Sequence, residues 1–277
     1  MNPRFTKCIM VSFFCFILFI SLFTIPGASA STLKISYINN KESGFILIQT
    51  PNQRTMLIDS GTNKDAPTVI QKLKAHRIKK IDILVATNAN DDRIGAMDEM
   101  MKQFKTGHLY IPKVNFMSRA LEDLLMAARQ TGLVYITRNT GGLSLDLDPD
   151  LKIEMLTPYE EDYKNPNDFT AALKLTYGKT AFLLAGDATR VSLQEILKKG
   201  PNLKANLLMA GRQGKNTIIN DKFLAAVSPD YAVISPNITG KTIVTRMQKA
   251  GLKICQARAN RTIIAESNGT KISLTER

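Results

Sequence analysis

The chain has 277 residues, of which 44% are hydrophobic and 22% are charged. This composition supports one large domain or two small ones and excludes an intrinsically disordered, collagen-like or disulfide-stapled chain. Lysine and arginine total 37 against 24 acidic residues, which gives a net charge of +13. Only two histidines are present, His76 and His108, so functions that require a histidine cluster are excluded.

The first 30 residues have the pattern of a targeting segment. Two cations precede an apolar run over residues 8–25, a Pro-Gly break and small residues over 28–30. This pattern predicts a cleaved signal peptide over 1–30 and an exported domain over 31–277. The alternative is an uncleaved membrane anchor, because the apolar run is long enough to span a bilayer. Beyond this segment the only cysteine is Cys255, which we interpret as a buried apolar side chain without a disulfide partner.

Strand and helix patterns alternate along the first half of the exported part. Apolar runs rich in β-branched residues predict strands, and apolar residues at helical spacing predict helices. In chain order these elements are strands 33–38, 45–50 and 55–59, helix 65–78, strand 81–86, helix 94–104, strand 109–111, helix 118–130 and strand 134–137.

The alternation continues in the second half. Residues 139–150 are rich in Gly and Asp and predict a turn or a short edge segment, whereas 158–168 predict a polar loop. The elements predicted around and after them are strands 151–156, 171–177 and 180–185, helix 191–197, strand 205–209, helix 222–227, strand 231–234, helix 243–250 and a meander over 253–274. Two such halves without a linker predict two mixed sheets packed together, with helices on the outside.

Four polar turns follow predicted strands. In folds of this class, functional side chains lie on loops that leave the carboxyl ends of strands. The turns are 57–61 (Leu-Ile-Asp-Ser-Gly), 87–95 (Thr-Asn-Ala-Asn-Asp-Asp-Arg-Ile-Gly), 184–187 (Leu-Ala-Gly-Asp) and 211–214 (Gly-Arg-Gln-Gly).

With these turns, the sequence resembles the metallo-β-lactamase superfamily and, more narrowly, the hydrolase-like domain of ComEC-type DNA-uptake proteins and their secreted relatives. The resemblance covers the chain from about Leu33 to its end. The matching segments, all in the family's order, are 46–52, 56–61, 79–85, 167–168, 173–178, 182–187 and 231–235. The resemblance implies an α/β (α+β) fold, the four-layer αββα sandwich of the metallo-β-lactamase fold.

The metal-binding motif of the family is altered in this chain. Active members have His-x-His-x-Asp-His after the strand that corresponds to 81–86, and these side chains hold one or two metal ions that activate water for hydrolysis. Here Asn88, Asn90 and Arg93 stand at the histidine positions, and only Asp92 is retained.

Two further loops depart from the family pattern. Arg212 and Gln213 replace the histidine pair of a Gly-His-His-Gly loop, and residues 39–44 replace the Asp-Val-Gly-Gln-Gly-Asp loop of the ComEC type. The carboxylates that the fold would still bring to one cleft are those of Asp59, Asp92 and Asp187.

This set of residues is unsuited to zinc, which prefers imidazole and thiolate ligands. Arg93 also adds a positive charge where the cation would lie, and two unit charges 4 Å apart interact by about 4 kcal/mol at an effective dielectric constant of 20. We expect that Arg93 fills the metal position and pairs with Asp92 and Asp187, so that no cofactor is bound. The alternative is a hard ion, Mg²⁺, Mn²⁺ or Ca²⁺, held by Asp59, Asp92 and Asp187.

The sequence therefore predicts an exported pseudoenzyme, secreted or in the cell envelope, with no transmembrane span after signal cleavage. Its expected role is to bind a phosphate-bearing ligand such as DNA or a nucleotide, or another polyanion, through a basic surface. The alternatives are a Mg²⁺- or Mn²⁺-dependent phosphodiesterase and a protein that binds an envelope or uptake-machinery partner. The residues expected to line the former metal cleft are Asp59, Asn88, Asn90, Asp92, Arg93, Asp187, Arg212 and Gln213.

Overall fold

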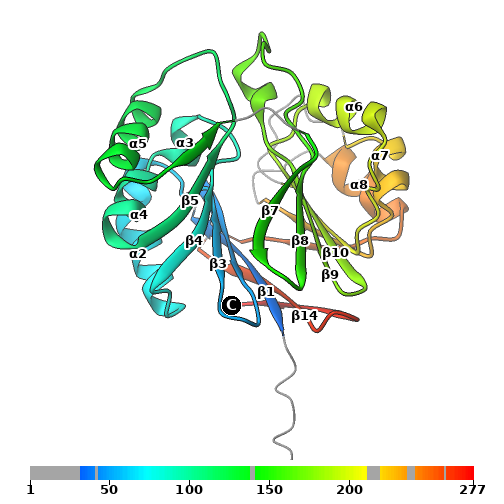
Figure 1. Cartoon of the computed structure of the whole chain (residues 1–277). Helices are drawn as coiled ribbons and strands as arrows, with labels where there is room; N and C mark the ends of the chain where they lie inside the picture. The colour runs from blue at the N-terminus through cyan, green and yellow to red at the C-terminus, as the bar shows by residue number, and fades with distance from the viewer. Residues whose placement is uncertain (1–31, 41–42, 138–140, 211–218, 236–240, 259) are drawn as a thin grey trace, which may run out of the picture. The chain divides into compact units, whose positions relative to one another are not determined.

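Two mixed β-sheets packed face to face form the centre of the molecule (Figure 1). The computed structural model describes residues 32–40, 43–137, 141–210, 219–235, 241–258 and 260–277. The predicted signal peptide lies outside the described residues. None of the described helices is both long and apolar enough to span a membrane.

The first sheet has eight strands, and the parallel strands β3 to β6 occupy one side of it. From edge to edge these strands are β15 (Ile272–Glu276), β14 (Thr262–Ser267), β1 (Leu33–Asn40), β2 (Ser43–Gln49), β3 (Thr55–Ile58), β4 (Lys80–Val85), β5 (Lys105–Ile111) and β6 (Tyr135–Thr137). The strands β1 and β2 form the antiparallel hairpin that the sequence predicts.

The second sheet has seven strands, with β10 to β13 parallel and β7 to β10 antiparallel. From edge to edge they are β13 (Lys253–Gln256), β12 (Tyr231–Ile234), β11 (Leu207–Ala210), β10 (Thr180–Gly186), β9 (Leu173–Tyr177), β8 (Leu151–Met155) and β7 (Leu143–Asp148). The strand β7 confirms the prediction of an edge segment within residues 139–150.

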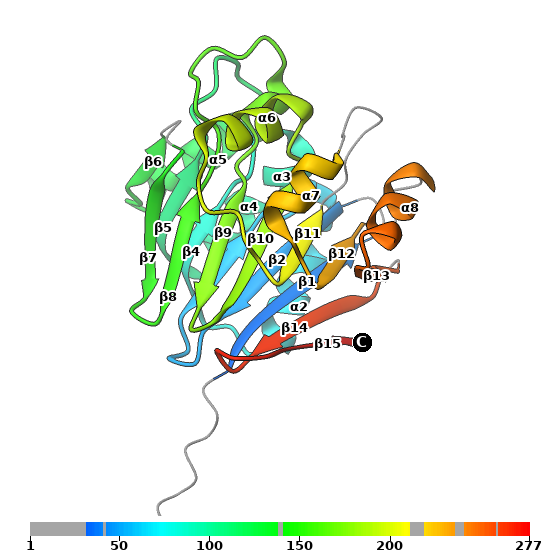
Figure 2. The same ribbon diagram turned by 90° about the vertical axis from the view of Figure 1, so that its right-hand side faces the viewer.

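Helices cover the outer face of each sheet, which gives four layers (Figures 1 and 2). The first sheet is covered by α2 (Ala66–Ala75), α3 (Asp91–Ile94), α4 (Met97–Gln103) and α5 (Arg119–Gln130). The second is covered by α6 (Arg190–Lys199), α7 (Asp221–Val227) and α8 (Lys241–Lys249). Two short 3₁₀ turns, η1 (Asn63–Asp65) and η2 (Pro166–Phe169), precede α2 and β9.

Three apolar layers hold this arrangement together. Ile48, Phe182 and Met209 belong to the layer between the sheets, whereas Leu84 packs beneath the first set of helices and Leu208 beneath the second. Strands such as β4 are therefore apolar on both faces, as expected for strands covered on both sides. Burying each large apolar side chain contributes about 1.5–3 kcal/mol.

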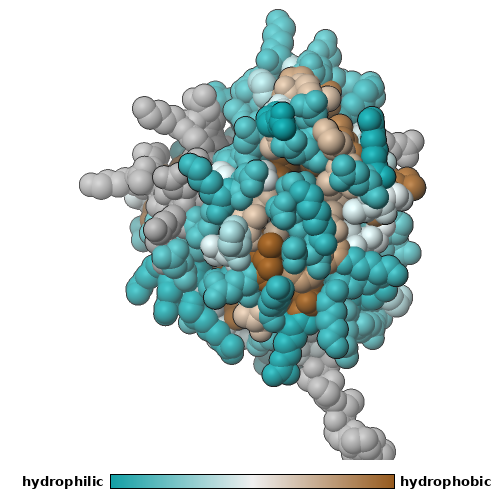
Figure 3. All heavy atoms as spheres, turned by 90° about the vertical axis from the view of Figure 1, so that its left-hand side faces the viewer, coloured by the Kyte–Doolittle hydropathy of each residue, from teal (hydrophilic) through white to brown (hydrophobic). Residues whose placement is uncertain are grey.

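The outer surface of the first helical layer is mostly hydrophilic, with small apolar areas (Figure 3). The helix α5 shows the reason, because Leu121 and Leu124 are buried whereas Arg119 is 80% exposed at its side chain. Ser118 accepts a hydrogen bond from the backbone N–H of Leu121 and so caps the helix at its start.

The predicted helix 94–104 is confirmed with a later start as α4 (Met97–Gln103), and the short helix α3 precedes it, with Gly95 and Ala96 between them. A Cβ atom on Gly95 would lie 2.5 Å from the backbone nitrogen of Asn63. The turn η1 therefore packs directly on the junction, and only glycine permits this approach.

The prediction of a single meander over 253–274 is wrong. The strand β13 joins the second sheet beside β12, whereas β14 and β15 cross to the first sheet beside β1. The alternation of apolar and polar residues predicts strands but not which strands pair, so the division between the two sheets could not be predicted from the sequence.

Candidate functional site

The predicted site residues from both sheets meet at one edge of the sandwich. Asp59 follows β3, the loop 87–90 follows β4, and Asp187 follows β10. Arg93 reaches the same place from α3, directly after the β4 loop. This is the edge at which the carboxyl ends of β3, β4 and β10 lie, as the sequence predicts.

Asp59 is held in a conformation that few side chains adopt. Its φ angle is 60°, and its backbone N–H donates to the carbonyl of Val85 at 2.9 Å. The carboxylate accepts two hydrogen bonds from Thr87, one from the backbone N–H at 2.8 Å and one from the hydroxyl at 2.7 Å. Asp is among the few residues that tolerate this left-handed region, and the bonds to Thr87 fix it there.

Asp59 is also nearly inaccessible to solvent. Burial raises the pKa of Asp59 to about 7, although Arg93 and the hydrogen bonds from Thr87 lower it. A buried carboxylate of this kind requires a nearby positive charge to stay ionised at neutral pH.

Arg93 supplies that charge. The side chain is 7% exposed, its guanidinium forms an ion pair with Asp187, and its Nε lies 4.0 Å from Oδ2 of Asp59. Burial lowers the pKa of Arg93, but the carboxylates of Asp187, Asp59 and Asp92 raise it well above the ordinary value. The guanidinium therefore stays charged and joins a loop of the first sheet to a loop of the second.

The backbone of Arg93 is fixed as firmly as its side chain. Its carbonyl accepts hydrogen bonds from the backbone N–H of Ser60 at 2.8 Å and from the Ser60 hydroxyl at 3.2 Å. The same hydroxyl accepts a hydrogen bond from the backbone N–H of Ala96. The turn after β3 and the helix α3 thus form one hydrogen-bonded unit around the ion pair.

The two asparagines use their amides to connect loops. The Asn88 side chain accepts a hydrogen bond from the backbone N–H of Asn90 at 2.8 Å and lies 3.5 Å from the Thr170 hydroxyl, to which it donates. The Asn90 side chain donates to the Asn167 side-chain oxygen at 2.9 Å. Asn167 and Thr170 lie just before β9 of the second sheet. Both asparagines therefore bridge the sheets through neutral groups.

Most of the site residues predicted from the sequence meet here. The structure brings together Asp59, Arg93 and Asp187 by direct contact, and Asn88 and Asn90 lie in the adjoining loop. Asp92 is half-buried on α3 beside Arg93. Arg212 and Gln213 lie outside the described residues.

Three residues of the site were missed. Thr87 is the first residue of the predicted polar turn 87–95, and Asn167 lies in a segment that matches the family. Both residues could therefore have been identified from the sequence. Thr170 could not, because its contact with Asn88 joins positions 82 residues apart in the chain.

A catalytic metal of the kind found in active family members does not fit the described residues. Nowhere in the described part of the chain do three His, Cys, Asp or Glu side chains group in a way that could hold a metal ion. Asp59 of the first sheet and Asp187 of the second both approach the Arg93 guanidinium. A divalent cation among them would meet a fixed positive charge.

The four layers and the loops at the carboxyl ends of the strands define a metallo-β-lactamase fold. CmlA, a diiron β-hydroxylase from Streptomyces venezuelae, has this fold at a TM-score of 0.55 and 11% identity, over 84% of this chain and 53% of CmlA. A long-form RNase Z from yeast has it at a TM-score of 0.51 and 12% identity, over 87% of this chain and 49% of the RNase Z. At these identities the likeness shows the fold alone.

The sequence places the chain within a family. Residues 44–237 match the Metallo-beta-lactamase superfamily, and the chain belongs to that superfamily. It is 28% identical to ComE operon protein 3 of Bacillus subtilis, over 92% of this chain and 34% of that protein. It is 26% identical to Competence protein ComA of Neisseria gonorrhoeae, over 76% of this chain and 28% of that protein. The chain thus spans about a third of the length of these relatives.

Proposed function

We propose that this protein is a non-hydrolytic member of the superfamily that binds a phosphate-bearing ligand, with DNA as the main candidate. The observation that carries the proposal is the ion pair of Arg93 with Asp187 and Asp59. It puts a permanent cation at the position where the resemblance to active members places a metal ion. The ion pair stabilises the cleft without a metal, because the guanidinium neutralises the carboxylates around it.

Two observations favour a nucleic acid as the ligand. The chain has 37 lysines and arginines against 24 acids, and a cationic surface attracts the phosphate backbone without regard to base sequence. One of the two relatives is named Competence protein ComA, and the sequence resembles the ComEC type of DNA-uptake protein.

We also propose that the protein acts outside the cytoplasm, secreted or in the cell envelope, beside an uptake machine. The predicted signal peptide over 1–30 supports this location. The matching part is about a third of the length of the relatives.

Metal content and turnover, measured on the same sample, test the proposal. The protein is purified without a histidine tag, incubated with Zn²⁺, Mn²⁺, Mg²⁺ or Ca²⁺, and analysed by elemental mass spectrometry. Hydrolysis of bis(p-nitrophenyl) phosphate is measured with and without chelator. We expect no stoichiometric metal and no chelator-sensitive turnover. One bound equivalent of Mn²⁺ or Mg²⁺ with chelator-sensitive hydrolysis would establish the phosphodiesterase alternative instead.

DNA binding is measured separately by fluorescence anisotropy with labelled single- and double-stranded oligonucleotides. The affinity should fall steeply between about 50 and 200 mM salt, as expected for phosphate contacts. Heparin and polyglutamate serve as controls of similar charge. Equal affinity for all polyanions would show attraction by charge alone and would contradict a DNA ligand.

A further inference from the structure

A pocket lined by lysines lies on the outer face of the second sheet, over β8, β9 and β10. Its volume is 340 Å³. Lys179, at its rim, precedes β10, whereas Asp187 of the Arg93 cleft follows β10, so the two sites lie at opposite ends of this strand. In Figure 2, β8 and β9 lie to the left of α7 and α8, and no helix is drawn in front of the lower parts of these two strands. The charged and amide residues that line the pocket are Lys152, Glu154, Lys174, Lys179, Asn202 and Lys204.

The pocket has more positive than negative charge. Its one carboxylate, on Glu154, is paired with Lys152 at 2.8 Å. Within the described residues, no carboxylate lies within ion-pairing distance of the amino groups of Lys174, Lys179 or Lys204. Three ammonium groups at one hollow repel each other unless an anion lies between them.

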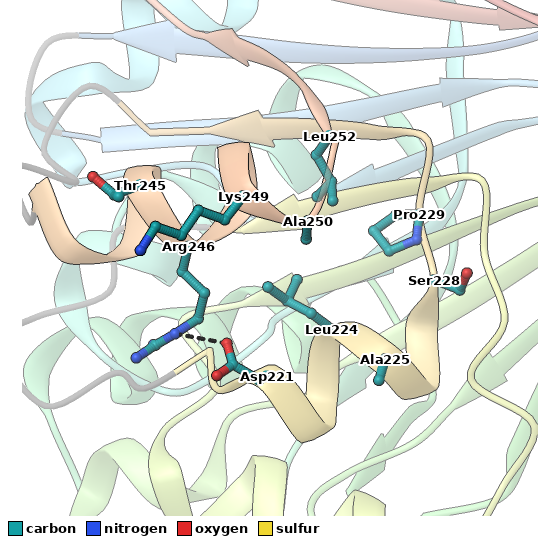
Figure 4. A pocket seen from close by; sticks show the side chains of 10 residues that line it. All are labelled: Asp221, Leu224, Ala225, Ser228, Pro229, Thr245, Arg246, Lys249, Ala250 and Leu252. Atoms are coloured by element: carbon teal, nitrogen blue, oxygen red, sulfur yellow. Dashed lines mark ion pairs between the residues drawn. The ribbon is translucent and has the colours of Figure 1, made fainter.

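The larger hollow between α7 and α8 differs in this respect. It has a volume of 860 Å³, and its half-buried arginine, Arg246, is already paired (Figure 4). The Nε of Arg246 lies 2.9 Å from the Asp221 carboxylate, and its guanidinium donates to the carbonyl of Ile219 at 2.7 Å. That arginine already has a carboxylate and a carbonyl as partners, so its contacts do not point to an anionic ligand.

Lys174 is the residue that makes the lysine pocket unusual. It is only 5% exposed, although lysine is almost never fully buried unless it is paired. Its amino group donates to the carbonyl of Asn202 at 2.6 Å, which uses one of its three hydrogens. Burial lowers the pKa of Lys174, whereas Glu154 raises it. An anion in the pocket would accept the remaining hydrogens and offset the cost of burying the charge.

We propose that this pocket binds a phosphate group, with Lys174 at its base and Lys179 and Lys204 at its rim. The phosphate is either free or part of the phosphodiester backbone of a nucleic acid. Lysine ammonium groups bind phosphate as point charges with several donors, which suits a tetrahedral oxyanion met from several sides. This site goes beyond the proposed function, because it needs no ligand in the Arg93 cleft.

Titration with inorganic phosphate tests the site directly. The lysine amino groups are followed by NMR in protein labelled with ¹⁵N-lysine, with sodium chloride at matched ionic strength as the reference. We expect saturable shifts of the Lys174 and Lys204 signals with phosphate and not with chloride. Lys174→Gln should weaken phosphate binding by about tenfold, because a charge-assisted hydrogen bond is lost.

Lys74→Gln is the matched control. Lys74 is exposed on α2, in the opposite helical layer, and its replacement removes the same charge from the protein. Its phosphate affinity should stay within about twofold of the parent, because exposed charges at long range are screened. Equal losses in Lys74→Gln and Lys174→Gln, or the absence of a saturable response to phosphate, would overturn the proposal. If Lys174→Gln does not fold, the exposed Lys179 and Lys204 provide the same test as glutamine variants.

A labelled 12-nucleotide single strand distinguishes the two sources of phosphate. If the pocket contacts a nucleic acid backbone, phosphate should displace the strand, and Lys204→Gln should reduce the slope of log K against log salt by about one. Phosphate binding without any effect on the strand would assign the pocket to free phosphate. Metal-dependent hydrolysis would contradict the proposed function but leave this result unchanged.

Discussion

The Arg93→Met variant tests whether the buried Arg93 holds the loops around Asp59 and Asp187 together. Met keeps the unbranched apolar part of the Arg side chain but has no charge, so the variant leaves Asp59 and Asp187 without their shared partner. Removing one member of a buried ion pair typically costs about 3–5 kcal/mol, because the remaining charge stays buried and uncompensated. For a domain of this size, the midpoint of thermal unfolding should fall by about 6–20 °C.

An exposed ion pair provides the control for this variant. Arg119 is 80% exposed at its side chain and lies 3.1 Å from Asp123, one helical turn away. Arg119→Met should cost less than about 1 kcal/mol, since water screens such pairs. Urea unfolding of both variants, followed by circular dichroism, gives the comparison, and equal m-values would confirm that the same surface is exposed.

The pH dependence of Arg93→Met gives an independent check. Arg93 lowers the pKa of Asp59, so its removal raises that pKa further above the value in the unfolded chain. When the pKa of an acid is raised in the folded state, the free energy of unfolding of the protein falls as the pH rises towards that pKa. The difference in free energy of unfolding between the parent and Arg93→Met should therefore be larger at about pH 8 than at about pH 5. A loss of free energy of unfolding as small as that of Arg119→Met, or a loss that becomes smaller as the pH rises, would refute the reasoning.

Three further variants test other parts of the site. Burial raises the pKa of Asp59 to about 7, so the free energy of unfolding of the parent falls between about pH 4 and pH 7. In urea unfolding, the free energy of unfolding of Asp59→Asn should fall by about 2 kcal/mol less than that of the parent between pH 5 and pH 8. The triple variant Asn88→His, Asn90→His and Arg93→His should gain retention of Zn²⁺ in elemental analysis, because it rebuilds the family motif; parent-like metal content would show that the other loops prevent binding. Gly95→Ala should destabilise the protein by about 1–3 kcal/mol in thermal unfolding, since its Cβ would lie 2.5 Å from backbone atoms; an unchanged midpoint would show that η1 can move away.

Helices and strands were predicted well where neighbouring residues in the chain determine them. The apolar run of β4 marked a strand covered on both faces, and Ser118 before an apolar helical pattern marked the start of α5. The order of strands, helices and polar turns then sufficed to indicate an αββα sandwich, because each element must bury its apolar face against a neighbour.

Features that depend on distant partners could not be predicted from the residues alone. The break at Gly95 exists because η1, some 30 residues earlier, packs on it. The pairing of β13 with β12 and of β14 with β1 depends on which sheet edge is free in the folded molecule. The same holds within the site, where Asp59 joins Asp187 as a partner of Arg93 and Thr170 meets Asn88 across the sandwich.

The differences between this site and the family motif are physically linked. Asp59 is buried and Asp187 is half-buried, and both carboxylates approach the Arg93 guanidinium, so in the metal-free site that we propose a cation is needed between them. Arg93 provides it from within the motif itself. Neutral amides at positions 88 and 90 fit this arrangement, because they hold the β9 side of the cleft by hydrogen bonds and add no further positive charge. A single Arg93→His change would remove the permanent cation without providing a full ligand set, so the altered residues are best understood as one unit.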